Sequence, residues 1–408
     1  MQKFLESIGI ASKDNNNAIL SLSALRLIEE SFDDIDMIYD MHTHLGGSEE
    51  SVTGCCIHPN LNSMFHPFSF GQQIVFKAAV GISNNSGGDE EYLNKLVFRT
   101  KNISTICVNK NGNLPTYRHL LLAMTHWHDP DGTQRPDLTT MYIPNDYMLQ
   151  VVNKYPELFD PCVSIHPAQK NALEELEKYA NLGVRVIKWL PNSMGINPSN
   201  ISYIPFYKKM QELNMIILCH LGEEHAMSAG GVDQKLGNPL HLRLPLDCGV
   251  KVIGAHCASE GDNVDFDDKD LKKTSNFKLF LRLMDTPKYK DLLFGDISSM
   301  LLYTRIGEPL TTILDREDLH ENLVFGSDYP VPCIGLISRT DKLYSYGYIT
   351  NEERLLLNEI FECNPLLFDF VGKRCVKSPE TGNKFPKSLF GINHKLFGLN
   401  SNNSNNVI

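Results

Sequence analysis

The chain has 408 residues, of which 42% are hydrophobic and 21% charged, a composition typical of a globular protein with one large α/β domain or two smaller ones. The net charge of -11, with no basic stripe, argues against nucleic acid as a partner. No run approaches the ~20 apolar residues of a membrane span, and the first 17 residues lack the apolar core of a signal peptide. The ten cysteines are scattered without a Cys-x-x-Cys pair, which indicates free thiols and a cytoplasmic protein.

The N-terminal part predicts a helical extension over residues 1–35, because residues 18–33 have helical spacing. The first strand then covers residues 38–44 and ends at a pair of glycines. From residue 46 to about 116 the pattern is irregular and interrupted by proline and glycine. An insertion of this length is too long for a passive connection, so we expect helices and a lid over a site.

A regular alternation follows the insertion. Helices are expected over residues 171–181 and 204–213. Seven further short apolar strands are expected at residues 119–125, 161–165, 184–190, 215–220, 250–256, 292–298 and 322–328. Eight apolar strands separated by crossovers predict an α/β fold, a closed (β/α)₈ TIM barrel over residues 36–372. An open doubly wound sheet is the alternative, but no Gly-x-Gly-x-x-Gly turn supports it.

The C-terminal tail, residues 373–408, is broken by proline and glycine and ends in a low-complexity stretch of asparagine and serine. We expect its end to be disordered.

The ends of the predicted strands carry the residue types that bind metals. His42 and His44 lie one residue apart on the first strand, so their side chains share a face and can bind one divalent ion. Taken singly, each strand-end residue is more simply a satisfied polar group or a cap. Because the carboxyl ends of barrel strands open onto one face, the whole set indicates a metal site: His42, His44, Lys188, His220, His256 and Asp328.

The segment Gly326-Ser327-Asp328-Tyr329-Pro330, together with the strand-end residues, resembles the amidohydrolase superfamily. The resemblance extends over residues 36–370 and is to the amidohydrolase-related (metal-dependent hydrolase) branch that includes aminocarboxymuconate semialdehyde decarboxylase. It implies that His42 and His44 are first-strand ligands and that His220 is the fifth-strand ligand. It further implies that His256 is the sixth-strand ligand or base, and Asp328 the eighth-strand ligand and proton carrier.

Lys188 has two interpretations. By resemblance to binuclear members, it is carboxylated and bridges two metals, the version that we favour. Alternatively, it stays a cation that pairs with an acidic substrate beside a single metal. Zinc is the expected metal, and one or two ions remain open.

The function expected from these features is hydrolysis of an amide, lactone or ester of a small-molecule substrate. A metal-bound hydroxide would attack the carbonyl, with Asp328 and His256 as catalytic groups. The alternatives are a mononuclear decarboxylase or hydratase of a small carboxylic acid, a deaminase suggested by His220-Leu221-Gly222-Glu223, and a barrel that only binds. Two ions would favour hydrolysis, and one ion with a free lysine the decarboxylase.

Substrate contacts are expected from further residues near strand ends. Arg305 offers a guanidinium fork for a carboxylate. The others are Glu223, His126, His128 and His166. A homo-oligomer is left open.

Overall fold

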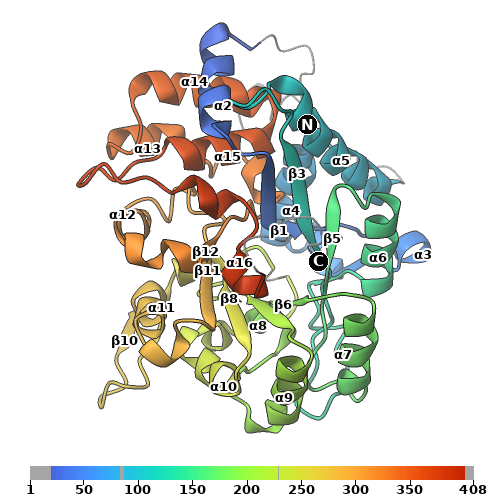
Figure 1. Cartoon of the computed structure of the whole chain (residues 1–408). Coiled ribbons are helices and arrows are strands. Elements are labelled where there is room, and N and C mark those ends of the chain that lie inside the picture. Colours follow the sequence, from blue (N-terminus) through green and yellow to red (C-terminus); the bar gives the residue numbers. More distant parts are fainter. Residues whose placement is uncertain (1–19, 83–86, 228, 400–408) are drawn as a thin grey trace.

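The computed structural model describes residues 20–82, 87–227 and 229–399, and it has a barrel of parallel strands at its centre (Figure 1). One sheet contains, in spatial order, β1 (Met37–His44), β3 (Thr116–Leu122), β5 (Phe159–Val163), β6 (Val186–Trp189), β7 (Ile216–Cys219), β8 (Lys251–Gly254), β11 (Leu293–Asp296) and β12 (Leu323–Val324). The first and last strands meet through backbone bonds from Met41 N to Phe325 O and from His44 N to Tyr329 O, each 2.9 Å long. The predicted (β/α)₈ barrel is confirmed.

Both faces of these strands are buried, which explains why they read as nearly continuous apolar runs. One set of side chains fills the interior of the barrel, among them Met41, Leu120 and Phe294. The alternate residues, such as Ile38 and Leu121, pack outward against the surrounding helices. The core is therefore two concentric apolar layers separated by the sheet.

The surrounding helices include the two expected from the sequence, which the structure places at Ala172–Asn181 (α7) and Ile204–Glu212 (α9). The others are α6 (Asn145–Lys154), α8 (Pro191–Met194), α10 (Arg243–Asp247), α11 (Asn276–Met284), α12 (Glu308–Asp315), α13 (Thr340–Ser345), α14 (Asn351–Cys363) and α15 (Pro365–Cys375). Two short antiparallel strand pairs lie in the loops: β2 (Cys56–Ile57) pairs with β4 (Met141–Tyr142), and β9 (Asp262–Val264) forms a hairpin with β10 (Lys273–Ser275). Within the described ranges, no helix has the length and hydropathy that a membrane crossing requires.

The N-terminal helix α2 covers Leu22–Phe32, within the expected segment, whose residues 18 and 19 lie outside the described part. Ser21 caps it by accepting from Ala24 N at 3.1 Å. Its apolar face packs against α14 and α15, so α2 braces the outer helices rather than the barrel interior.

The insertion after β1 forms helices, as expected: α3 (Glu50–Thr53), α4 (Pro67–Val80) and α5 (Gly88–Ile106). α5 packs on β3 and thus serves as the crossover helix of the first β/α unit. Gln72 on α4 donates to His225 O, 3.0 Å away, in the loop after β7. The role of this region as a lid stays a prediction.

The tail closes the N-terminal end of the barrel. Its short helix α16 (His394–Phe397) lies across the ring of strands, in red in Figure 1. Leu396, only 1% exposed, joins the interior cluster. Lys251, the first residue of β8, donates from Nζ to Lys395 O and Leu396 O at 2.9 and 2.8 Å. The expected disorder concerns residues 400–408, which lie outside the described part.

We predict that Leu396→Ala lowers the free energy of unfolding by about 2–4 kcal/mol, because it leaves a void under the interior layer. Urea denaturation would measure the change. Leu355→Ala, at a side chain 54% exposed, is the matched control and should stay within about 0.5 kcal/mol of the parent protein. Equal effects of the two substitutions would show that α16 does not fill the barrel.

Candidate metal centre

Three ligand atoms converge where β1 and β12 end. His42 Nε2 lies 3.2 Å from His44 Nε2 and 3.5 Å from Asp328 Oδ1, and His44 Nε2 lies 3.3 Å from Asp328 Oδ1. We call these three atoms the ligand triangle. His42 and His44 converge because alternate residues of a strand share a face, as the sequence predicts.

The size of the triangle fits a small divalent ion. Two ligand atoms about 2.1 Å from one ion at the tetrahedral angle lie about 3.4 Å apart. All three edges are close to this value. Burial lowers the pKa of His44 to about 4, against the opposing effect of Asp328, so its imidazole is neutral at pH 7 and able to bind a metal. The residues present therefore fit a metal with three protein ligands and a further open position.

Asp296, at the end of β11, orients His42. Its Oδ2 accepts from His42 Nδ1–H at 2.8 Å, which leaves the lone pair of Nε2 in the triangle. Its Oδ1 accepts from His256 N at 2.7 Å and from Ser298 N at 3.1 Å. Burial raises the pKa of Asp296, but His42 and the other donors lower the pKa by more than burial raises it. The net pKa is below its usual range, so the carboxyl is ionised. Although Asp296, His42 and His256 also lie close enough to share an ion, the oxygens of Asp296 are already committed to these donors.

Asp40, in the middle of β1, joins the two ends of the barrel sheet below the triangle. Its Oδ1 accepts from His42 N at 3.0 Å and from Ser327 N at 2.8 Å, and its Oδ2 from Tyr117 OH at 3.0 Å. Gly326 lies so close to β1 that a Cβ there would be 2.7 Å from the His42 Cβ. The Gly326-Ser327 part of the motif thus lets the eighth strand approach the first.

Asp328 lies just past β12 in a left-handed backbone conformation, with φ at 63°. Its Oδ1 belongs to the triangle, and its Oδ2 accepts from Ser299 Oγ at 2.6 Å. Burial raises the pKa of Asp328, but the nearby histidines His256, His42 and His44 outweigh it and hold the pKa well below its usual range. The carboxylate is therefore ionised and able to act as an oxygen ligand.

His256 faces Asp328 across the site, with its Nε2 3.9 Å from Asp328 Oδ2. Its Nδ1 lies 2.7 Å from Ser298 Oγ, whose hydroxyl donates to Asp296. Nδ1 therefore carries the hydrogen, and the lone pair of Nε2 faces the site. The backbone has φ of 56°, 49° and 52° at His256, Cys257 and Ala258, three consecutive left-handed residues that cost about 1–3 kcal/mol each.

Lys188, at the end of β6, is 1% exposed, and its Nζ lies 2.9 Å from His42 Nε2. Burial lowers the pKa of this amine, against the attraction of Asp328 and Asp296. The structure thus places the side chain beside the triangle, as the sequence predicts. Its carboxylation stays a prediction.

His220 does not join the triangle. Its ring centroid lies 5.3 Å from that of His256, and its Nε2 faces Glu223 O at 3.3 Å and Glu224 Oε2 at 3.5 Å. Because both neighbours are acceptors, Nε2 carries the hydrogen and Nδ1 is the nitrogen left for a ligand. Its role as a ligand stays a prediction.

Glu224 is the residue that the sequence reasoning missed. It is 6% exposed, and its Oε1 accepts from Ala226 N and Met227 N at 2.6 and 2.9 Å. Glu223, the expected site acid, instead has a side chain 37% exposed that lies 3.4 Å from His225. The turn after His220 therefore points Glu224, not Glu223, toward the histidine.

The expected contacts His126, His128 and His166 form a separate group beyond β3 and β5. The rings of His128 and His166 lie 4.6 Å apart, while His126 stacks on Tyr142 at 3.8 Å. His166 is fully buried: its Nδ1 accepts from Ala168 N and its Nε2 donates to Met194 O, both at 3.1 Å. Both nitrogens of His166 are thus used by the backbone, and substrate contact by the three histidines stays a prediction.

Arg305 lies in the loop after β11, buried against Glu260. Its Nη2 donates to Glu260 Oε2 at 3.1 Å, and its side chain is 7% exposed. Nη1 is buried and has no hydrogen-bond partner among the residues that the structure describes. Burial lowers the pKa of His256, and the charge of Arg305 lowers it further. The pKa of His220 is also lowered, first by burial and less strongly by charges that include Arg305. A guanidinium with an unused donor therefore lies near these two histidines.

No protein-family model matches the sequence, and no curated protein matches it at a significant level. Similar solved structures include a candidate 2-pyrone-4,6-dicarboxylic acid hydrolase from Pseudomonas putida (14% identity, 88% of this chain and 97% of that chain, TM-score 0.43). Others are IDCase from Metarhizium anisopliae (11%, 89% and 97%, 0.45) and a candidate amidohydrolase from Staphylococcus aureus (12%, 78% and 95%, 0.41).

We predict that His166→Gln reduces the acid sensitivity of the metal-free protein. Burial lowers the pKa of His166 to about 3, so the unfolded chain binds its proton more readily and stability falls as the pH drops below about 6.5. At pH 5 this histidine should cost about 2 kcal/mol relative to pH 8. Urea unfolding at the two pH values should show a smaller difference in the variant, whereas His225→Gln, at an exposed side chain, should match the parent protein. An unchanged pH dependence in His166→Gln would contradict the prediction.

Proposed function

We propose that this chain is a metal-dependent hydrolase of the amidohydrolase superfamily that acts on an amide, lactone or ester carbonyl of a small molecule. The observation that carries the proposal is the ligand triangle of His42, His44 and Asp328, whose three edges of 3.2–3.5 Å match those around one tetrahedral ion. Zinc is the metal we propose, because imidazole and carboxylate ligands in this geometry suit it. A bound divalent ion would lower the pKa of water to about 7 and polarise a carbonyl oxygen.

The residues around the triangle supply the proton transfers. Asp328, ionised and held by Ser299, can take a proton from the attacking water and return it to the leaving group. His256 presents its Nε2 lone pair on the same side, 3.9 Å from Asp328 Oδ2, and can act as a second base or as a ligand. Asp296 and Asp40 hold His42 in place through hydrogen bonds to its ring and its backbone, so little reorganisation of this residue is needed during the reaction.

Two features favour a site for two ions. The rings of His220 and His256 lie 5.3 Å apart and outside the triangle, so we propose that they form a second ligand group. Lys188 lies against the triangle, and its lowered pKa favours the neutral amine that a carboxylated lysine requires. The proposed carboxylated Lys188 would join the two groups with anionic oxygens.

The alternative function is a mononuclear decarboxylase or hydratase of a small carboxylic acid. It is favoured by Arg305, which lies near His256 and His220 and whose buried Nη1 has no partner in the described part of the chain. Such a donor is costly to leave unused and fits a substrate carboxylate. A deaminase is less well supported, because Glu223 is paired with His225 away from the triangle.

The metal content tests the proposal. We expect that changing His42 and His44 together to alanine removes most of the bound zinc, because two of the three triangle atoms are lost. Elemental analysis after zinc loading and dialysis measures it, and two ions per chain would support the hydrolase over the decarboxylase. His126→Ala with His128→Ala, a histidine pair of the same spacing, is the matched control and should keep the metal. Unchanged metal in the first variant would reject the triangle.

Arg305 gives a test of substrate chemistry. We expect that Arg305→Gln raises KM at least about tenfold for those N-acyl amino acids and lactones that carry a free carboxylate, since a charge-assisted bond is worth about 1.5–3 kcal/mol. Esters of the same substrates should be unaffected. Steady-state kinetics on matched acid and ester pairs measures the difference, and Arg305→Lys, which keeps the charge without the fork, should fall between. An equal loss on acids and esters would show that Arg305 is only structural.

A further inference from the structure

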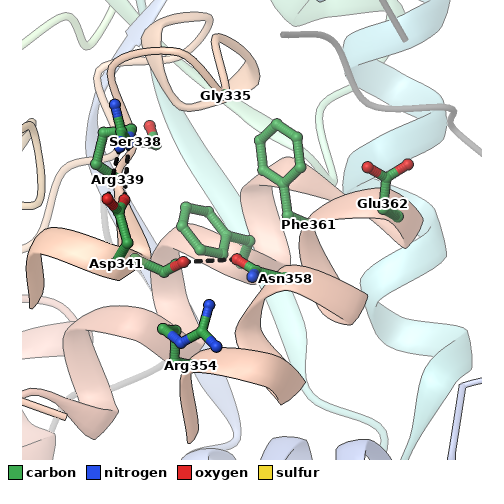
Figure 2. Close-up of a pocket in the computed structure, with 10 residues that line it drawn as sticks. Gly335, Ser338, Arg339, Asp341, Arg354, Asn358, Phe361 and Glu362 are labelled. Atoms are coloured by element: carbon green, nitrogen blue, oxygen red, sulfur yellow. Dashed lines mark hydrogen bonds and ion pairs between the residues drawn. The ribbon is translucent and has the colours of Figure 1, made fainter. Parts of the chain in front are cut away.

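A cavity of about 340 Å³ opens between the loop that follows β12 and helices α13, α14 and α15. We call it the α13–α14 pocket, and Figure 2 shows the side chains that line it. Its volume is at the lower end of the range found for small-molecule sites, about 300–1,000 Å³. None of its lining residues belongs to the metal centre.

The walls of the pocket combine aromatic rings with polar groups. Phe361 and Phe368 are 7% and 2% exposed and supply the apolar part. Asn358 accepts from Thr340 Oγ1 through its Oδ1 at 2.6 Å, so its amide nitrogen remains as a donor. An aromatic or alicyclic body can therefore lie against the rings while a polar end meets the helix α14.

The charges in the pocket are unequally committed. Arg339 and Asp341 neutralise each other through two bonds of 2.7 and 2.5 Å, drawn as dashed lines in Figure 2. Arg354 uses only its Nε, which donates to Asn351 Oδ1 at 3.0 Å, and its guanidinium lies 5.9 Å from the Tyr344 ring centroid. No bond from its two terminal nitrogens is found within the described part of the chain. These nitrogens form the planar fork that recognises a carboxylate.

We propose that the α13–α14 pocket is a second binding site, for a small monocarboxylate with a ring-shaped apolar body. Arg354 and the Asn358 amide hold the carboxylate, and Phe361 and Phe368 contact the ring. Binding at this site requires neither the metal nor the proposed hydrolysis.

The pocket also lies next to the catalytic side of the barrel. A smaller cavity shares Ser338 and Phe368 with it and reaches Ser299, whose hydroxyl holds Asp328. A ligand in the pocket therefore contacts Ser338 and Phe368, which line the same small cavity as Ser299, the residue bonded to Asp328. This places the second site where its occupancy can be felt by the metal centre.

Benzoate is the probe for the test, with benzamide as its neutral counterpart. Isothermal titration of the full chain should show that benzoate binds both the parent protein and the variant with His42 and His44 changed to alanine. Arg354→Gln should weaken binding at least about tenfold. Asn358→Asp, which keeps the shape and the acceptor for Thr340 but adds a negative charge, should weaken it similarly. Arg316→Gln, at an arginine paired with Asp285 and Asp318 elsewhere, is the matched control and should bind like the parent protein.

Each of the following results would overturn the proposal: equal binding of benzamide and benzoate, benzoate affinity unchanged in Arg354→Gln and Asn358→Asp, or binding lost in the histidine variant. The last result would assign benzoate to the metal centre instead. Absence of benzoate binding at 20-fold excess over millimolar protein would equally reject the site. Thermal melting of each variant confirms that it is folded.

Discussion

The closure of the barrel between its first and last strands is the constraint on which the site depends. β12 is only two residues long, yet its far end must meet β1 so that Asp328 reaches His42 and His44. The buried carboxylate of Asp40 makes this junction specific, because it accepts backbone hydrogens from both sides, from His42 and from Ser327. A buried charge is tolerated only when its hydrogen bonds are complete, and here the bonds that satisfy it also set the spacing of the ligand atoms.

At another strand end, too, one buried carboxylate holds several groups in place. One oxygen of Asp296 accepts from the side chain of His42 and the other accepts from the backbone of His256. A single carboxylate therefore positions two histidines. The bond from His256 N to Asp296 helps to hold the left-handed residues that begin at His256 against their intrinsic cost. The similar conformation of Asp328 is held by a bond from its own N to His42 O. Strain of this kind is kept where a side chain must be aimed, and here it is found at the ends of the sixth and eighth barrel strands.

Much of this could be predicted from the sequence, for reasons that are local. The spacing of His42 and His44 follows from the period of a strand, and apolar runs ending in polar residues give the barrel and its catalytic rim. What could not be predicted depends on partners far away in the chain. The choice of Glu224 over Glu223 is set by the turn after β7, and the bonds of Asp40 join residues 287 positions apart. The role of α5 as a crossover helix could not be predicted, because the insertion around it shows no clear hydrophobic periodicity.

The seal that α16 forms beneath the strands has a consequence for biogenesis. Because Leu396 follows all eight barrel strands in the chain, this end of the inner layer remains open to water on the ribosome until α16 has been made and has docked. The nascent protein therefore exposes apolar side chains at the N-terminal end of the barrel while most of its helices are already made. Chaperones that shield such apolar surfaces should therefore influence the yield of the folded protein.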